Sequence, residues 1–556
     1  IFVYGGSLAV TSTTIEANLG SSIYYGSGGG LYISNSSPVA LSDSLIRNNH
    51  GSTNQLNAGG ANGGGILIES SQAVLTGNTI TDNSASTGPG GLASASGGGL
   101  YVSGGSLTMV DNTLSGNIAA EKNTGWGGGA ALINCEASLT GNTFEGNLAS
   151  PVSTGSGGGL YAHFGSVVTL TDNLFQNNTA ASAGAGYGGG IEISESDATL
   201  INNTLSGNTG SAGSIGYGGG ILMFGSLTDT GVFVLQGNTI TGNKASSVAT
   251  GYGGGIHVGW DSRLTDLTMG GNLLENNIAG SATEGVGGGI HLRDVEADLS
   301  ENILVQNQAL SSASGTGNGG GLYGNGVVLS MQNNVISANH ALTHGAGMYL
   351  LAEDAYLYKT ANLLHNTIAD NGGCGEGIYA YTWVQLTLTN SILTGHTTYG
   401  AYTASNYSSL VMDGTLWYEN GSNTGGSGTI TTTNEYTGDP VFSAPLTGNF
   451  HIAGTSAAID RGIDAQVESD MDGQPRPNGA APDLGADEYY ASGGPASAEL
   501  RAFPPQWFFR KDPDTGEVGS SLQQRYLIQF LHHDTPGYVT SITNPLPTDF
   551  SFQAEQ

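Results

Sequence analysis

Hydrophobic and polar residues alternate in short stretches along most of the chain, and the stretches recur. The pattern is seen in "LYVSG" (100–104), "SLTMV" (106–110) and "NTLSGN" (112–117), which Gly, Asn and Ser residues separate. Alternation with a period of two predicts β-strands with one buried face, and the small polar residues predict turns. These stretches lack the period of about 3.6 residues that an amphipathic helix requires. Each repeated unit is therefore predicted to hold three short strands.

The repeat is marked by triple glycines. GGG occurs ten times, starting at residues 28, 63, 97, 127, 157, 188, 218, 253, 287 and 319, with spacings of 30–35 residues, and degenerate copies follow at 345, 375 and 399. A strand too short to bury its face alone does so by stacking on the same strand of the next unit. The repeats predict an all-β parallel solenoid of about fourteen coils over residues 1–430.

The position of each residue after the triple glycine predicts its face. Aliphatic residues at the first and third positions, such as Leu31 and Ile33, are expected to point inward, and the residue between them outward. The outward column comprises Phe2, Tyr32, Leu67, Tyr101, Ala131, Tyr161, Glu192, Leu222, His257, His291, Tyr323, Tyr349, Tyr379 and Tyr402. We expect its planar side chains to stack. Stacking is favoured over a metal site at His257 and His291, because the column offers no third ligand beside them.

Asparagines form a second column. Its members are Asn78, Asn112, Asn142, Asn173, Asn203, Asn238, Asn272 and Asn302. Inward asparagines at the corners of a solenoid can donate hydrogen bonds from coil to coil, and they tolerate left-handed turns. The column predicts a structural ladder.

Composition restricts the partners. Glycine is 94 of 556 residues and charged residues are only 10%, so the polar surface consists mainly of hydroxyl and amide groups. The 44 acidic residues outnumber the 12 basic ones, which disfavours nucleic acid, because phosphate binding requires clustered cations. No apolar run approaches the ~18 residues of a membrane span, so no membrane insertion is expected in this segment.

The repeat phrases resemble those of bacterial surface proteins with a right-handed parallel β-helix, including polymorphic outer-membrane and adhesin types. Examples are "LTGNTITDN" (75–83) and "LQGNTITGN" (235–243). "GDPVF" (438–442) and the stretch from "GNFHIAGTSAAID" (448–460) to "DLGADEY" (483–489) are similar to the C-terminal region of choice-of-anchor Q proteins, with Thr455–Ala458 in place of the usual Ser-Pro-Ala. The resemblance implies a secreted protein of the bacterial cell surface, with the C-terminal end of the helix at 431–490.

One candidate metal site lies within that end. Glu468, Asp470 and Asp472 alternate ahead of Gly473, which is the beginning of a calcium-loop pattern. The twelfth position of the pattern is Gly479 instead of a bidentate Glu. We keep structural calcium and an acidic surface turn as alternatives, and expect no other cofactor.

The chain changes character after a linker at 491–499. Residues 500–556 are strand-rich and faintly resemble an Ig-like module, which is short for a two-sheet sandwich of ~100 residues. We therefore expect a small β-sandwich-like module that is incomplete by itself. A head-to-tail polymer would pair it with the first coil of another copy, through Ile1, Val3, Leu8, Val10, Tyr526, Ile528 and Phe530.

These patterns predict an extracellular structural or adhesive protein, in which self-association or surface glycans supply the partner. Exposed rings can stack on sugars, so Tyr323, Tyr349, Tyr379 and Tyr402 are candidate glycan-stacking residues. The alternative is a polysaccharide-binding or polysaccharide-cleaving protein. Because no paired carboxylates or arginine base share a column, we predict no catalytic residues and no enzymatic activity.

Overall fold

The computed structural model describes residues 1–22, 26–53, 60–88, 94–228, 230–260, 265–353, 357–445 and 448–491, and four strands beyond them. The chain divides into two compact units, Ile1–Tyr489 and Tyr490–Gln556. Among the described residues there is no α-helix, and consequently none that is long and apolar enough to cross a membrane. The first unit holds the repeats.

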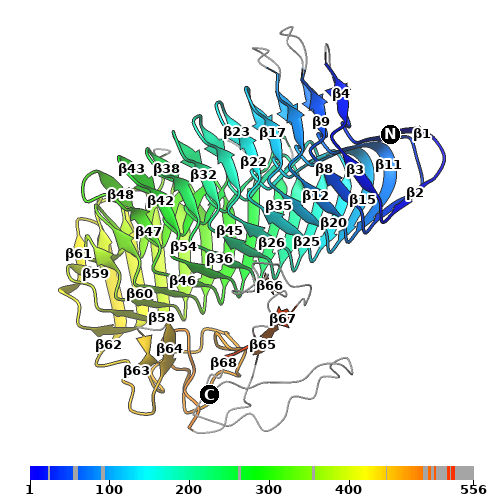
Figure 1. Ribbon diagram of the computed structural model, residues 1–556. Helices are drawn as coiled ribbons and strands as arrows, with labels where there is room; N and C mark the ends of the chain where they lie inside the picture. The colour runs from blue at the N-terminus through cyan, green and yellow to red at the C-terminus, as the bar shows by residue number, and fades with distance from the viewer. Residues whose placement is uncertain are drawn as a thin grey trace, which may run out of the picture. The chain divides into compact units, whose positions relative to one another are not determined.

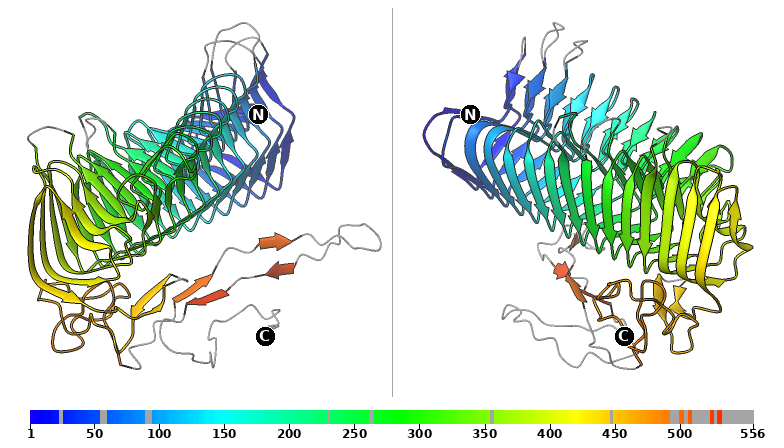
Figure 2. Two further views of the ribbon diagram at one scale, coloured as in Figure 1. Left: turned by 90° about the vertical axis from the view of Figure 1, so that its left-hand side faces the viewer. Right: turned by 180° about the vertical axis from the view of Figure 1, so that it is seen from behind.

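One coil illustrates the architecture. It contains β28 (Gly186–Tyr187), β29 (Ile191–Ser194), β30 (Asp197–Ile201), β31 (Thr204–Ser206) and β32 (Thr209–Ser211). Each strand pairs in parallel with its counterpart one coil later, so that Ile191 lies beside Ile221 and Tyr187 beside Tyr217. Figure 1 shows this stack of coils, and Figure 2 shows it from two further sides. The predicted right-handed parallel β-helix is confirmed.

The strands that follow the glycine corners stack in one series. The series is β1 (Phe2–Tyr4), β6 (Leu31–Ser34), β11 (Ile66–Thr76), β15 (Leu100–Val110), β19 (Ala130–Ile133), β24 (Leu160–His163), β29, β34 (Ile221–Phe224), β39 (Ile256–Val258), β44 (Ile290–Arg293), β49 (Leu322–Asn325), β53 (Met348–Leu351), β57 (Glu376–Ala380), β59 (Tyr399–Thr403) and β61 (Ser422–Gly426). A second series is formed by β2 (Leu8–Thr11), β7 (Val39–Ser42), the later parts of β11 and β15, β20 (Glu136–Thr140), β25 (Val167–Thr171), β30, β35 (Gly231–Gln236), β40 (Thr265–Gly270), β45 (Glu296–Ser300), β50 (Val328–Gln332), β54 (Lys359–Leu364), β58 (Val384–Thr394), β60 (Ser409–Tyr418) and β62 (Thr429–Thr437).

A third series in the large sheet, from β3 (Thr14–Glu16) through β31 to β55 (Thr367–Ala369), and two smaller sheets complete the coils. One has twelve strands, from β4 (Leu19–Ser21) to β56 (Gly372–Gly373), and the other has ten, from β5 (Gly26–Ser27) to β48 (Thr316–Asn318). The complete coils therefore number about twelve, fewer than the fourteen predicted, because the later coils lack the strands of these sheets.

The predicted asparagine ladder is confirmed. The side-chain amide of Asn78 donates to Asn112 Oδ1 and to the Leu41 carbonyl, each at 2.9 Å, and its backbone N–H also donates to Asn112 Oδ1. The same pattern connects Asn78, Asn112, Asn142, Asn173, Asn203, Asn238, Asn272, Asn302, Asn334 and Asn366. Each buried carboxamide thereby satisfies both its donors and its acceptor.

A second ladder, which we did not predict, runs beside the glycine corners. It joins Asn18, Asn49, Asn83, Asn117, Asn147, Asn178, Asn208, Asn243, Asn277, Asn307, Asn339 and Asn371. A Cβ on Gly99 would lie 3.0 Å from the Cγ of Asn117, and a Cβ on Gly98 would collide with the Gly128 carbonyl. Gly97 has a φ of 66°, which favours glycine. Each of the three glycines is therefore required: the first for its left-handed backbone, and the second and third because a Cβ would contact the next coil or the asparagine ladder.

The core is as predicted, but most of the outward column is buried or half-buried, with Phe2 in the first coil as an exposed member. Leu31 and Ile33 are fully buried. In the outward column, however, His257 is only 2% exposed and Tyr349 only 8%. These side chains lie in the corner between two sheets, where residues that precede the triple glycine cover them: Tyr217 contacts the edge of His257 with ring centres 5.6 Å apart. The alternation of residues along one strand shows which side chains point away from the core, but not whether residues of another strand cover them.

The residues predicted for assembly lie in different surroundings. Ile1 is exposed, whereas Leu8 and Val10 are half-buried and pack against the core. In the second unit, β65 (Glu499–Ala502) pairs with β68 (Ile528–Leu531), and β66 (Gln506–Phe508) pairs with β67 (Gln523–Arg525), both antiparallel. Tyr526 lies outside the described residues, as does most of the module that we expected to resemble a sandwich. Head-to-tail assembly stays a prediction.

We predict that Asn178→Ala lowers the free energy of unfolding by at least about 2 kcal/mol, because each buried polar group left without a partner costs about 1–3 kcal/mol. Asn178 bonds to Asn147, Asn208 and the Phe144 carbonyl. Chemical denaturation measures the change. The matched control is Asn177→Gly, which removes an exposed neighbour with a φ of 55° and is expected to be nearly neutral. Equal losses in the two variants would contradict a stabilising ladder.

Candidate functional site

The regular coil is interrupted on one side, where three consecutive coils connect their first and second strands differently. β24 and β25 are joined by residues 164–166, β29 and β30 by residues 195–196, and β34 and β35 by the longer connection 225–230. A cavity of about 350 Å³ lies among these turns. Its lining residues are Phe164, Gly165, Ser166, Glu195, Ser196, Asp197, Ser226, Thr230 and Gly231.

Phe164 is the unusual residue of the cavity. Its φ is 57°, a left-handed conformation that the residue after this strand also adopts in other coils, whether it is a glycine, as at Gly104, or another residue, as at Asn134 and Glu195. The left-handed conformation costs about 1–2 kcal/mol for a residue with a side chain. The ring is nonetheless 60% exposed, and its centre lies 3.8 Å from that of His163. An apolar side chain that is both strained and exposed is a mark of function more than of packing.

Two carboxylates line the same cavity. Asp197 is exposed, and its Oδ1 accepts a hydrogen bond of 2.9 Å from the backbone N–H of Val232. Glu195 is half-buried, and its Oε2 lies 4.0 Å from His163 Nε2. The turns themselves are linked, because the Gly165 N–H donates to the Glu195 carbonyl at 2.7 Å. Both carboxylates are therefore held on a rigid part of the backbone.

Hydroxyl groups supply the rest of the polar lining. The Ser196 hydroxyl donates to the Ser194 carbonyl and accepts from the backbone N–H of Ser166 at 3.1 Å, whereas Ser226 and Thr230 are half-buried. The described lining contains two acidic side chains and neither Lys nor Arg. An exposed ring beside carboxylates and hydroxyls can bind a sugar, whose apolar face packs on the ring while its hydroxyls form hydrogen bonds.

The tyrosines predicted to stack on glycans stack instead on one another. Ring centres are 5.1 Å apart from Tyr323 to Tyr349, 5.2 Å from Tyr349 to Tyr379 and 5.4 Å from Tyr379 to Tyr402. Neighbouring rings thus cover both faces of Tyr349 and Tyr379. Burial raises the pKa of Tyr379 to about 12, so its phenol stays protonated. Their part in glycan binding stays a prediction.

The histidine pair belongs to the same stack. The rings of His257 and His291 are parallel within 14°, with centres 4.4 Å apart, and His291 stacks in turn on Tyr323. Burial lowers the pKa of His257 to about 3, so the ring is neutral at physiological pH. The prediction that planar side chains stack in this column is confirmed.

Glu192 occupies the same column, and among the described residues no cationic side chain pairs with it. It is 6% exposed, and burial raises its pKa to about 8, against smaller effects of hydrogen bonds with Ser156 and Ser194. The carboxyl group is therefore protonated at neutral pH.

The three predicted calcium ligands do not converge. Glu468 is exposed, and both carboxylate oxygens of Asp470 accept backbone N–H bonds, from Asp472 and Gln474 on one side and Glu488 on the other. Asp472 lies instead beside His451 and Asp487. Structural calcium bound by the predicted residues stays a prediction.

Sequence reasoning missed the cavity, although two signals were present. Phe164 in "HFGSV" (163–167) is a large apolar residue at a position where other coils have a small or polar one, such as Gly104 or Asn134. The spacing of triple glycines also rises from 30 residues between 188 and 218 to 35 between 218 and 253, which marks the longer connection. Neither signal shows which turns lie side by side until the coils are superimposed.

The fold and the cavity define a parallel β-helix with a polar lateral site. The family model for a right-handed β-helix region matches residues 1–154 and 92–268. Solved structures with similarity include the periplasmic alginate epimerase AlgG (12% identity, 62% of this chain and 76% of that chain, TM-score 0.32). Others are the Dettilon tailspike protein gp208 (13%, 63% and 61%, TM-score 0.28) and the pectate lyase Pel9A (12%, 77% and 89%, TM-score 0.24). No curated protein matches the chain.

One prediction is corrected by these comparisons. We expected no enzymatic activity, but two of the similar structures are enzymes by name, an epimerase and a lyase. The absence of paired catalytic residues in one column does not exclude activity, because a site can also be formed by residues of turns that lie outside the column. The statement that the chain is not an enzyme is withdrawn.

We predict that Glu192→Gln alters the dependence of stability on pH. In the wild type, the folded-state pKa of about 8 exceeds the ordinary value of 4.5, so the stability contributed by Glu192 is present below pH 4.5 and is lost as the pH rises towards 8. The loss is about 1.4 kcal/mol per pH unit. Denaturation at pH 5 and pH 8 should show this decline in the wild type and a smaller one in the variant. The exposed Glu145→Gln is the control, and an unchanged slope in Glu192→Gln would contradict the assignment.

Proposed function

We propose that this chain is an extracellular glycan-binding protein that holds a polysaccharide against the side of its β-helix, in the cavity at Phe164. The observation that carries the proposal is the exposed, left-handed phenylalanine in a cavity that two carboxylates also line. A glycine there would relieve the backbone and would lose only the contact between the ring and His163. The ring is better explained by a ligand that packs on it.

The charge of the protein selects the class of glycan. The net charge is −32, and the described lining of the cavity adds two carboxylates without a basic side chain. A polysaccharide of uronic acids would be repelled from such a surface, whereas a neutral or amino-sugar polymer would not. We propose a neutral or amino-sugar glycan as the ligand.

The proposed setting is the bacterial cell surface. It is supported by the resemblance of residues 438–442 and 448–489 to choice-of-anchor Q proteins, and by a surface rich in hydroxyl and amide groups. There the protein would act as an adhesin through the cavity, or would process the chain that it binds. Self-association into filaments is compatible with either role and is a separate proposal.

We predict that Phe164→Gly weakens glycan binding about tenfold while leaving the fold as stable as before or more stable. The affinity falls because the packing surface of the ring is removed, and tenfold corresponds to about 1.4 kcal/mol. Stability is retained because glycine adopts the left-handed conformation without strain. A glycan array with neutral, amino-sugar and uronic-acid polymers, followed by calorimetry, measures the affinity, and thermal unfolding measures the stability.

The matched control is Val411→Ala, which removes an exposed apolar side chain on the distant strand β60. Asp197→Asn tests the carboxylate in the same assay. Product analysis after incubation with each bound polymer distinguishes binding from processing. Wild-type affinity in Phe164→Gly, or preferential binding of uronic-acid polymers, would refute the proposed site or the proposed ligand class, respectively.

A further inference from the structure

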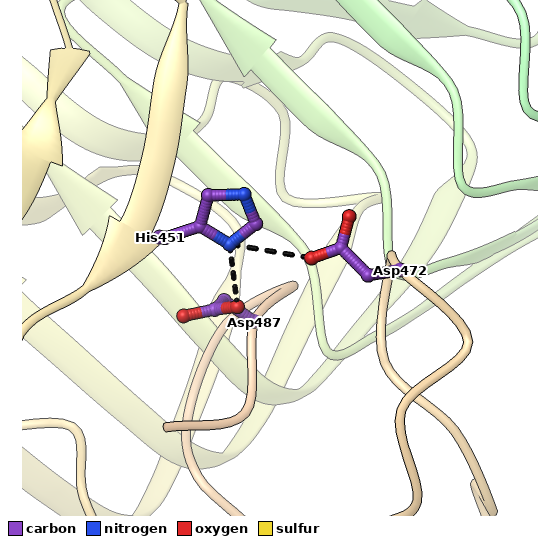
Figure 3. A group of neighbouring side chains, drawn as sticks. All are labelled: His451, Asp472 and Asp487. Atoms are coloured by element: carbon purple, nitrogen blue, oxygen red, sulfur yellow. Dashed lines mark hydrogen bonds and ion pairs between the residues drawn. The ribbon is translucent and has the colours of Figure 1, made fainter. Parts of the chain in front are cut away.

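Three side chains from separate segments converge at the C-terminal end of the first unit, far from the cavity in sequence. His451 is on β64 (Asn449–Ile452), Asp472 is in a turn, and Asp487 lies near the end of the unit. His451 Nδ1 is 2.9 Å from Asp487 Oδ1 and 3.3 Å from Asp472 Oδ2, as Figure 3 shows. All three potential ligand atoms lie within 4.8 Å of one another. One nitrogen and two carboxylate oxygens therefore face a common point.

The backbone fixes this arrangement. The second oxygen of Asp487 accepts the N–H of Ile452 at 2.7 Å, which directs its first oxygen at His451. Asp472 is oriented by its own N–H, which donates to Asp470 Oδ1 at 3.0 Å, and the adjacent Met471 N–H donates to the Ala486 carbonyl. Preorganised ligands lower the cost of binding an ion. His451 and Asp487 are buried, whereas Asp472 is half-buried, so the site adjoins solvent on the side of Asp472.

Negative charge exceeds positive charge around these residues. The buried carboxyl groups of this region are those of Asp470, Asp483, Asp487 and Glu488. The buried cationic side chains are Arg476, which pairs with Glu488 at 3.0 Å, and His451 when protonated. A bound cation would compensate this excess.

The donor set selects the type of cation. Calcium prefers six to eight oxygen ligands, whereas zinc and related ions accept imidazole nitrogen together with carboxylate oxygen. Ligand atoms about 2 Å from a tetrahedral ion are roughly 3.3 Å apart. The separation of His451 from Asp472 already has this value, and the separation from Asp487 would have to open by a few tenths of an ångström.

We propose that His451, Asp472 and Asp487 bind a divalent transition-metal cation of the zinc or manganese class, with water completing its coordination. The ion would connect β64, the turn at Asp472 and the end of the segment at Asp487, and would thereby stabilise residues 449–489 internally. That segment already contacts the coils: the side-chain amide of Asn390 donates to the Ile463 carbonyl at 2.7 Å, and the Ala486 N–H donates to Thr367 Oγ1 at 3.0 Å. The alternative is an imidazolium shared between two carboxylates without a metal.

The test uses the full chain, stripped with EDTA and titrated with ZnCl₂, MnCl₂ and CaCl₂ by calorimetry and thermal unfolding. We expect about one equivalent of zinc or manganese to bind and to raise the unfolding midpoint by a few degrees, because a ligand that binds only the folded state stabilises it. Asp487→Asn and Asp472→Asn should each weaken binding at least about tenfold. Glu468→Gln is the matched control in the same segment and should bind as the wild type does.

Three outcomes would overturn the proposal. The first is the absence of both heat and a shift in the wild type with zinc and manganese, which would favour the shared imidazolium and does not depend on any variant folding. The second is zinc binding of wild-type affinity in both aspartate variants. The third is stabilisation by calcium alone that is lost in Glu468→Gln, which would favour the calcium loop predicted from the sequence. None of these results depends on whether a glycan binds at Phe164.

Discussion

The hydrogen-bonded asparagine at each corner is the interaction on which the structure depends. A buried carboxamide has two donors and an acceptor to satisfy. In this helix its N–H groups donate to the next asparagine along the axis and to a backbone carbonyl of the preceding coil, and its oxygen accepts from the preceding asparagine. A side chain at the third glycine would crowd the second ladder, since a Cβ on Gly99 would lie 3.0 Å from Asn117 Cγ, and it would also collide with the Gly129 carbonyl. GGG and the second asparagine of each unit, as in "SGN" (115–117), are therefore the two sides of one packing contact, whereas the asparagine of GNT belongs to the first ladder.

The features that could be predicted from the sequence are those that depend on a pattern within one strand or on a position repeated in successive units. Alternation within one strand placed Leu31 and Ile33 in the core, and a shared position in successive units placed the asparagines in a ladder. Exposure was predicted less well. Tyr349 points away from the core but lies in a corner between two sheets, and such a corner is not visible in a pattern with a period of two. The candidate sites were harder still, since the cavity depends on the lengths of turns in three successive coils, and His451 meets Asp487 without any repeat to align them.

Both candidate sites arise where the repeat is broken. At Phe164 a coil has a large ring at a turn position that other coils fill with a small or polar residue, and two coils later a longer connection contributes to the lining of the cavity. At the C-terminal end the alternation stops, and residues 449–489 fold as turns held by buried carboxylates, with Ile452, Ala458 and Leu484 packed on Ile392 and Leu416. The regular coils contribute rigidity, and the irregular segments contribute the chemical groups, which is the usual division between a scaffold and its loops.

Because the contact between coils is repeated, the distance from the cavity to the C-terminal end of the first unit depends on the number of coils between them. Each coil meets its neighbours through the same hydrogen bonds, so a whole coil can be gained or lost between Phe164 and the C-terminal end without disturbing the chemistry of either. Every such event would move the cavity relative to that end by about 4.8 Å, the spacing of parallel strands. Among related chains, duplication or loss of gene segments could change the distance between the cavity and the C-terminal end in steps of one coil. The ligand selectivity of the cavity would stay the same.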